Sequence, residues 1–131
     1  MILTTKARYA VMAVIEISEN KYNQPVSLIA ISKNQRISLS YLEQIFARLK
    51  KSGIVKSVKG PGGGYVLGDE REKITVANII RAMGEAIKMT RCNTENKGCN
   101  NRNAKCKTHH LWRGLEDRIY EYLDSISINK L

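Results

Sequence analysis

Residues 38–51 read SLSYLEQIFARLKK, and the rest of the predicted architecture follows from this segment. Its large apolar side chains recur at helical spacing and form one stripe, which contains Leu42, Ile45, Phe46 and Leu49. The opposite side is polar and basic, with Ser40, Tyr41, Glu43, Gln44, Arg48 and Lys51. We expect an amphipathic helix that begins at Ser38 or Ser40 as its N-cap and ends before Gly53, which suits a C-terminal cap.

A shorter helix over residues 28–33 precedes this one, with Ser27 as its predicted N-cap. Residues 34–37 leave room only for a tight turn between the two helices. Further upstream, apolar residues at helical spacing over about residues 5–18 predict a longer first helix. Two short helices joined by a tight turn, the second with a polar and basic free face, predict a helix-turn-helix.

The segment after Gly53 changes to a strand pattern. Residues 54–58 read IVKSV and residues 65–68 read YVLG, with the turn KGPGGG between them, so a β-hairpin is expected. A glycine-rich loop can also cradle a nucleotide phosphate, but that site needs a following Gly-Lys-Ser/Thr and a helix, whereas a strand follows here. A hairpin directly behind a helix-turn-helix is typical of a wing.

Two further helices are predicted. Thr75 can cap a helix that runs to about Ala86, with Ile74 placed to pack against Ile79. Near the C-terminus, a helix of about five turns carries one apolar stripe, which contains Leu111, Trp112, Leu115, Ile119, Tyr122, Leu123 and Ile126. Because so small a domain has little surface to cover a stripe of that length, we expect this helix to pack against another subunit.

A polar segment between these two helices holds every cysteine of the chain. Cys92, Cys99 and Cys106 recur with six residues between neighbours, and His109 follows after two more. The segment has almost no apolar side chains with which to form a core of its own. Three thiols and one imidazole in a short loop predict a four-ligand metal site, and an odd number of cysteines argues against a disulfide framework.

Three kinds of cysteine site remain open: an iron–sulfur cluster, a zinc site and a metal-free thiol redox switch. Structural zinc usually takes closely spaced cysteine pairs, so the wide spacing favours a larger inorganic core. A neutral imidazole in place of one thiolate would raise the reduction potential of a cluster. His110 is an alternative to His109 as the fourth ligand, but its ring points about a quarter turn away on a helix.

Charge indicates the class of partner. The chain of 131 residues, enough for one domain, carries a net charge of +10, which predicts a polyanionic partner such as nucleic acid or an anionic membrane. The excess lies in residues 1–68 and 88–107. No apolar run reaches the roughly 18 residues of a membrane span, and charges at Lys6, Arg8 and Glu16 interrupt any signal peptide, so we expect a cytoplasmic protein.

Several segments together resemble the bacterial IscR-type iron–sulfur cluster regulators: residues 1–10, ISLSYLEQ at 37–44, GPGGGY at 60–65, and the cysteine segment with the Leu111-Trp112 that follows it. The resemblance implies a homodimeric winged helix-turn-helix repressor of cluster assembly genes. It also implies one [2Fe-2S] cluster per subunit, held by Cys92, Cys99, Cys106 and His109. Six residues separate successive cysteines here, one more than in the family pattern, and Lys59 stands where arginine is commoner.

The residues predicted to contact DNA lie in the second helix of the helix-turn-helix and in the wing; they are Ser38, Ser40, Tyr41, Glu43, Gln44, Lys59 and Gly60. The first turns of such a helix enter the major groove, and the wing reaches the minor groove. Glu43 leaves two interpretations open. Its carboxylate can accept a hydrogen bond from cytosine N4, or it can close a capping box with Ser40.

The sequence therefore predicts a mainly α protein with a small β-hairpin. It divides into a winged helix-turn-helix DNA-binding domain (1–87), a cluster-binding loop (88–109) and a dimerisation helix (110–131). The expected function is transcriptional regulation, mainly repression, at pseudo-palindromic double-stranded operators, with the iron–sulfur assembly machinery as cluster donor. No acid, base and nucleophile converge, so no enzyme is expected.

Other functions remain as alternatives. One is a nitric-oxide or iron-responsive repressor of the same fold with a different cluster, and another is a zinc or thiol redox-sensing regulator. A small iron–sulfur electron carrier is a third, but it would need neither a basic helix nor a wing.

Overall fold

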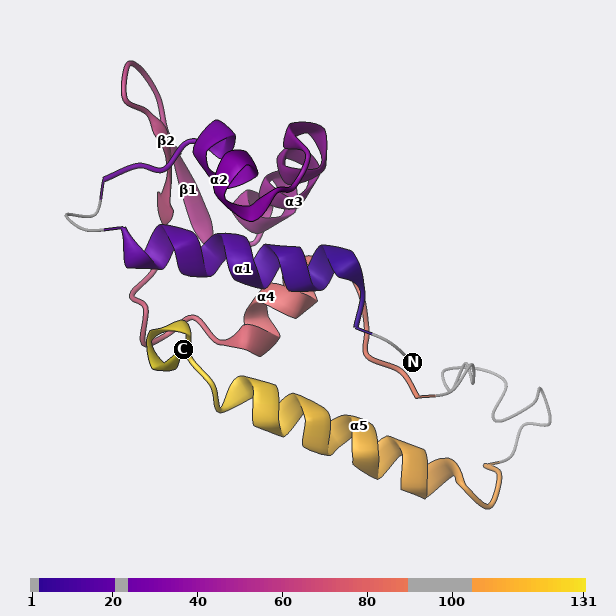
Figure 1. Ribbon diagram of the computed structural model, residues 1–131. Coiled ribbons are helices and arrows are strands. Elements are labelled where there is room, and N and C mark those ends of the chain that lie inside the picture. The colour runs from indigo at the N-terminus through magenta and orange to yellow at the C-terminus, as the bar shows by residue number, and fades with distance from the viewer. Residues whose placement is uncertain (1–2, 21–23, 90–104) are drawn as a thin grey trace.

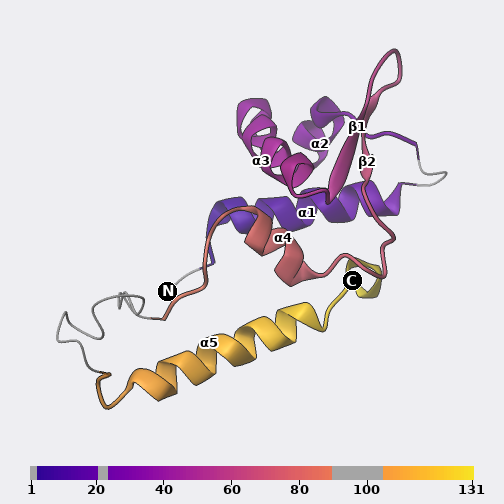
Figure 2. The same cartoon turned by 180° about the vertical axis from the view of Figure 1, so that it is seen from behind.

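The computed structural model describes residues 3–20, 24–89 and 105–131. Its elements are α1 (Thr5–Glu19), α2 (Leu28–Gln35), α3 (Leu39–Lys51), β1 (Val55–Val58), β2 (Gly64–Leu67), α4 (Val76–Ala82), α5 (His109–Asp124) and the 3₁₀ turn η3 (Ile128–Lys130). The pair α2 and α3 and the hairpin lie on one side of α1, and α4 and α5 lie on the other (Figures 1 and 2). The predicted mainly α fold with a small β-hairpin is confirmed.

Helix α3 follows α2 after a tight turn and forms the second half of a helix-turn-helix. Its N-cap is Ser38, whose hydroxyl accepts a hydrogen bond from the Tyr41 backbone N–H at 3.3 Å. The predicted apolar stripe, Leu42, Ile45, Phe46 and Leu49, is completely buried. Burial of that stripe fixes which side of α3 remains free for other contacts.

The hairpin is antiparallel, with Val55 opposite Leu67 and Val58 opposite Gly64. Its second strand is attached to the segment before α2, because Val26 and Tyr65 exchange backbone hydrogen bonds of 2.9 and 2.8 Å. The Tyr65 ring also packs on Phe46 of α3, with 4.7 Å between ring centroids. These contacts fix the wing relative to the helix-turn-helix.

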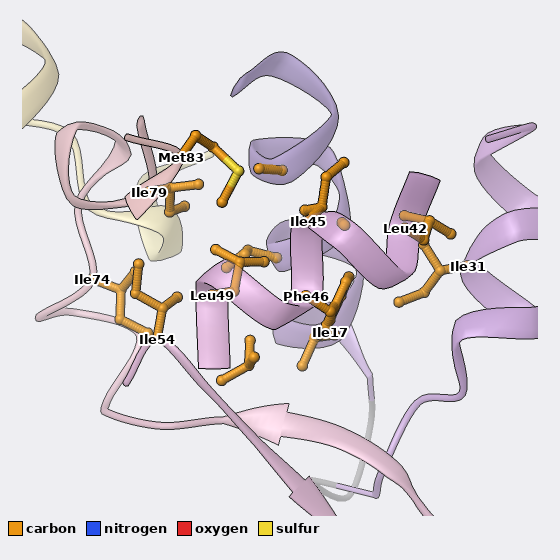
Figure 3. Packing of buried hydrophobic residues seen from close by; sticks show 14 of the residues in the cluster. Ile17, Ile31, Leu42, Ile45, Phe46, Leu49, Ile54, Ile74, Ile79 and Met83 are labelled. Carbon is orange, nitrogen blue, oxygen red and sulfur yellow. The ribbon is translucent and has the colours of Figure 1, made fainter. Parts of the chain in front are cut away.

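The main core contains buried residues of α1, α2, α3 and α4, together with residues of the segments between these helices (Figure 3). Its buried members include Ile17, Ile31, Leu42, Ile45, Phe46, Leu49, Ile54, Ile74, Ile79 and Met83. Ile128 of η3 also belongs to it, with 2% of its surface exposed. The backbone N–H of Ile128 donates to the Ile74 carbonyl at 2.9 Å, so the chain after α5 returns to the core of the helix-turn-helix.

Helix α4 begins as predicted and ends earlier than predicted. Thr75 is its N-cap and forms a capping box with Asn78. The sequence interpretation extended this helix to about Ala86, which is wrong, because it ends at Ala82 and Gly84 then takes a left-handed φ of 71°. The carbonyl of Met83 accepts a hydrogen bond from Arg48 Nη1 at 2.8 Å, which stabilises this early end.

No helix in the described part of the chain is both long and apolar enough to cross a membrane.

Candidate nucleic-acid interface and metal centre

The free side of α3 presents most of the residues predicted to contact DNA. Ser38, Ser40, Glu43 and Gln44 are exposed, and so are Lys59 and Gly60 of the wing. Helix α3 and the hairpin lie on the same side of α1 (Figure 1). A recognition helix and a basic wing on one side can contact adjacent grooves of one duplex.

Glu43 does not cap α3. Because Ser38 is the N-cap, the position three residues later is Tyr41 and not Glu43. The Ser40–Glu43 capping box is therefore wrong as an interpretation of the sequence. Within the described residues Glu43 forms no hydrogen bond or ion pair, so its carboxylate points to solvent without a structural partner.

Tyr41 is only half exposed, because its ring packs edge-on against Tyr9 of α1. The ring centroids are 5.9 Å apart and the planes meet at 83°. This contact restricts the orientation of the Tyr41 hydroxyl. Sequence reasoning missed Tyr9, because the two tyrosines are far apart in the chain and periodicity reports only contacts within one element.

Arg48 connects α3 to the segment that leads towards the cysteines. Its guanidinium donates to the Met83 carbonyl at the end of α4. Glu85, two residues after Met83, accepts a hydrogen bond from the Thr4 hydroxyl through its carboxylate. The sequence could not distinguish this exposed arginine from the other basic residues of α3.

Beyond Glu85 the chain is attached to α5. The Ile87 N–H donates to the Tyr120 hydroxyl at 3.0 Å, and the Met89 N–H donates to Glu116 Oε1 at 2.5 Å. Ile87 also belongs to a second small core with Ala7, Val76 and Ile80. The path into the cysteine segment is therefore fixed against α5 as far as Met89.

Cys92 and Cys99, two of the four predicted metal ligands, lie outside the described residues. Cys106 and His109 are described and half-buried. The His109 N–H donates to the Cys106 carbonyl at 3.1 Å, and the Cys106 sulfur is 3.6 Å from the Thr108 hydroxyl. His109 is the first residue of α5, so Cys106 and His109 lie within one turn of chain where that helix begins.

The neighbouring His110 differs from His109 in its surroundings. His110 is exposed, whereas His109 is half-buried, and the two rings meet edge-on with centroids 5.4 Å apart. A sulfur donor and an imidazole within one turn of chain fit a cysteine–histidine cluster site, and they also fit zinc.

The apolar stripe of α5 is divided between two surfaces. Ile119, Leu123 and Ile126 pack against the small core formed by Ala7, Val76, Ile80 and Ile87 of the same chain. Leu111, Leu115 and Tyr122 remain exposed, by 60%, 38% and 66% respectively. Part of the stripe is thus covered within the subunit, and the rest forms an exposed apolar surface.

Arg81 and Asp124 join α4 to the end of α5. The guanidinium donates two hydrogen bonds to the carboxylate, at 2.9 and 2.8 Å, and lies 4.9 Å from the centre of the Tyr120 ring. The hydrogen bonds from Arg81 lower the pKa of Asp124, and the same bonds raise the pKa of Arg81. The ion pair stabilises the position of α5 against α4.

Comparison with known proteins extends these observations. A model of the Rrf2 family, described as iron-dependent transcriptional regulators, matches residues 3–131. Over its whole length the chain is 50% identical to the HTH-type transcriptional regulator IscR of Photorhabdus laumondii, and covers 79% of that protein. It is 48% identical to IscR of Escherichia coli, again over its whole length, and covers 80% of that protein.

Solved structures show the same relationship. The chain superposes on T. potens IscR with a TM-score of 0.79 and 34% identity, over 98% of this chain and 84% of that one. It superposes on CymR, the global cysteine regulator of B. subtilis, with a TM-score of 0.80 and 32% identity, over 98% of this chain and 94% of that one.

Proposed function

Because the chain belongs to the Rrf2 family of DNA-binding transcriptional regulators, and its IscR-type resemblance is confirmed, we propose that it senses iron–sulfur cluster status and represses cluster assembly genes. Its relatives are named as regulators, so the chain is not an enzyme. The proposed cofactor is one [2Fe-2S] cluster per subunit, bound by Cys92, Cys99, Cys106 and His109 and received from the cytoplasmic assembly machinery.

The observation that best supports the cluster is the proximity of Cys106 and His109 at the start of α5. Thiolate and imidazole are ligands that [2Fe-2S] centres use together, and the family is described as iron-dependent. The bound cluster would supply a redox-active group that is present only when iron and sulfide are available. The protein supplies the ligands and the helix start that orients His109.

The free face of α3 supports the DNA-binding part of the proposal. Ser38, Ser40, Tyr41, Glu43 and Gln44 would read or flank bases in the major groove, and Lys59 and Gly60 would approach the minor groove. Two copies, joined through the exposed Leu111, Leu115 and Tyr122 of α5 near Trp112, would bind the two halves of a pseudo-palindromic operator.

Coupling between cluster and DNA has a structural basis in this arrangement. The segment 83–89 contacts α3 at its start, through Arg48, and α5 at its end, through Glu116. A cluster would link the chain beyond Met89 to Cys106 and His109. Binding of the cluster can therefore change the position of α5 relative to α3, and with it the preferred operator.

Protein purified without oxygen tests the cofactor. We expect two irons and two sulfides per chain, with Cys92→Ala, Cys99→Ala and Cys106→Ala losing both. His109→Cys should retain a cluster of lower potential, because a thiolate adds negative charge. His110→Ala is the matched control and should retain the normal cluster. One tightly bound zinc per chain without sulfide would refute the proposal and favour a zinc-dependent regulator.

A further inference from the structure

Arg36 has an uncommon backbone conformation for its residue type. It lies in the turn between α2 and α3 with φ 55° and ψ 44°, and it is the one non-glycine residue with positive φ in the described part of the chain. A side chain with a Cβ is disfavoured in this left-handed region, where glycine or asparagine is usual. The arginine is therefore present although a smaller residue would fit the turn better.

Neighbouring hydrogen bonds impose this conformation. The backbone N–H groups of Arg36 and Ile37 both donate to the Ser32 carbonyl, the second at 3.3 Å. The Ser32 hydroxyl donates to the Ile37 carbonyl at 2.6 Å, and Ile37 is buried in the core with 4% of its surface exposed. The turn is thus fixed on both sides of Arg36 whatever its side chain does.

Within the described residues, the Arg36 guanidinium makes no interaction that would offset the energetic cost of the left-handed backbone conformation. Arg36 is exposed and forms no ion pair with any described residue. The nearby carboxylate of Glu16 is engaged by two neutral amides, Asn34 Nδ2 at 2.6 Å and Gln35 Nε2 at 2.9 Å. Lys33 already places a cation in the last turn of α2, where it complements the helix dipole.

The position of Arg36 indicates a partner outside the chain. It lies two residues before Ser38, so its Cα is within roughly 7 Å of the N-cap of α3. In a helix-turn-helix the first helix crosses the DNA backbone and the second enters the major groove, so the turn between them lies beside backbone phosphates. Strained residues that persist in a structure cluster at functional sites.

We propose that Arg36 binds a phosphate of the DNA backbone beside the groove that α3 enters. This inference rests on the proposed DNA binding. It assigns to Arg36 a positioning role that carries no sequence information, in contrast to Glu43 and Gln44. Arginine suits the task because its planar guanidinium can donate two hydrogen bonds to one phosphate.

The test measures affinity and stability on the same variants. The probe is the duplex that the anaerobically purified wild-type protein selects from a random pool, and its dissociation constant is measured over a series of KCl concentrations. Arg36→Gly should weaken binding about three- to tenfold at low salt. Because each subunit then neutralises one phosphate fewer, the slope of log affinity against log salt should fall by about 0.9 per subunit. The melting temperature should rise by about 2–5 °C, because glycine relieves the left-handed strain.

Two controls distinguish this role from a general loss of charge. Arg36→Lys retains the cation and should retain the wild-type slope. Arg71→Gly removes one positive charge from the exposed loop between β2 and α4 and should leave the slope unchanged. An Arg36→Gly protein with the wild-type slope and affinity would overturn the inference while leaving DNA binding intact. Wild-type protein that selects no duplex would overturn both.

Discussion

Glu43 is exposed on the second turn of α3 and takes no part in the helix cap. We therefore predict that Glu43→Ala changes which operator sequences are bound and leaves stability within about 0.5 kcal/mol of wild type. Binding to a randomised duplex pool measures the first quantity, and urea unfolding measures the second. Glu72→Ala, which removes another exposed acid, should change neither. A clear loss of stability with unaltered sequence preference would contradict this role.

Asp124 provides a pH-dependent test at the same scale. The pKa of Asp124 is lowered from its ordinary value of 3.8, mainly by the hydrogen bonds from Arg81. The ion pair therefore contributes its full stabilisation at pH values above 3.8. This stabilisation is lost as the pH falls through the lowered pKa of the folded state. Both side chains are almost half exposed, which limits the contribution to about 0.5–1 kcal/mol.

Asp124→Asn should accordingly be less stable than wild type at pH 7, and the difference should shrink as the pH falls below about 4. Urea unfolding at pH 7 and at about pH 3 measures it. Asp117→Asn, which affects the looser and more exposed pair with Arg113, is the control and should have little effect at either pH. An equal difference at the two pH values would show that charge is not the cause.

Gly64 gives a prediction about the wing as an element. A Cβ on this residue would lie 2.4 Å from the Val26 carbonyl oxygen, which is impossible without moving the strand. Gly64→Ala should therefore separate the wing from the segment before α2 and lower the free energy of unfolding by about 1–3 kcal/mol. Gly62→Ala is the control: its φ is 73° but nothing lies within 4 Å, so only the backbone cost applies. Equal stability of Gly64→Ala and wild type would contradict the packing.

The outer face of α5, which consists of the exposed Leu111, Leu115 and Tyr122, gives a second prediction about a single element. Leu115→Asp or Tyr122→Asp should dissociate the proposed dimer and leave the subunit folded, because both side chains are exposed. Sedimentation equilibrium measures the dimer, and circular dichroism measures the fold. Arg113→Asp, at an exposed position on a different side of the same helix, is the control. Ile119→Asp is unsuitable, because Ile119 packs on its own subunit and its loss would disturb the fold as well. An unchanged dimer in both outer-face variants would place the interface elsewhere.

Sequence patterns predicted the elements that local signals define. The spacing of apolar residues and the positions of glycines predicted helix α3, its buried stripe and the hairpin, with bounds accurate to a few residues. The end of α4 was missed although Gly84, which takes the left-handed conformation after the C-cap Met83, is a local stop signal. The hydrogen bond from Arg48 to the Met83 carbonyl comes from another helix, and periodicity could not predict it. The return of Ile128 to the core was missed for the same reason, because its backbone partner Ile74 is far away in the sequence.

At the scale of the whole molecule, the candidate metal site is predicted in full by the sequence and described in part by the structure. The sequence names Cys92, Cys99, Cys106 and His109 as a set, and the structure shows that Cys106 and His109 are close together at the start of α5. The ligand set therefore stays a prediction. The division into residues 1–87, 88–109 and 110–131 also stays a prediction, although η3 packs into the core of the first part.

The segment 83–89 connects the recognition helix to the helix that begins at the candidate metal site. It touches α3 through Arg48 and α5 through Tyr120 and Glu116. We therefore expect a cluster bound beside the start of α5 to change which DNA the recognition helices prefer. The protein with the cluster and the protein without it should then differ in operator preference.

The most direct measurement is the affinity of both forms, prepared without oxygen from the same wild-type protein, for one panel of operators at one salt concentration. We predict that loss of the cluster changes the rank order of the operators, and that the Cys92→Ala protein reproduces the order of the cluster-free form. An identical rank order with and without the cluster would contradict the proposed coupling.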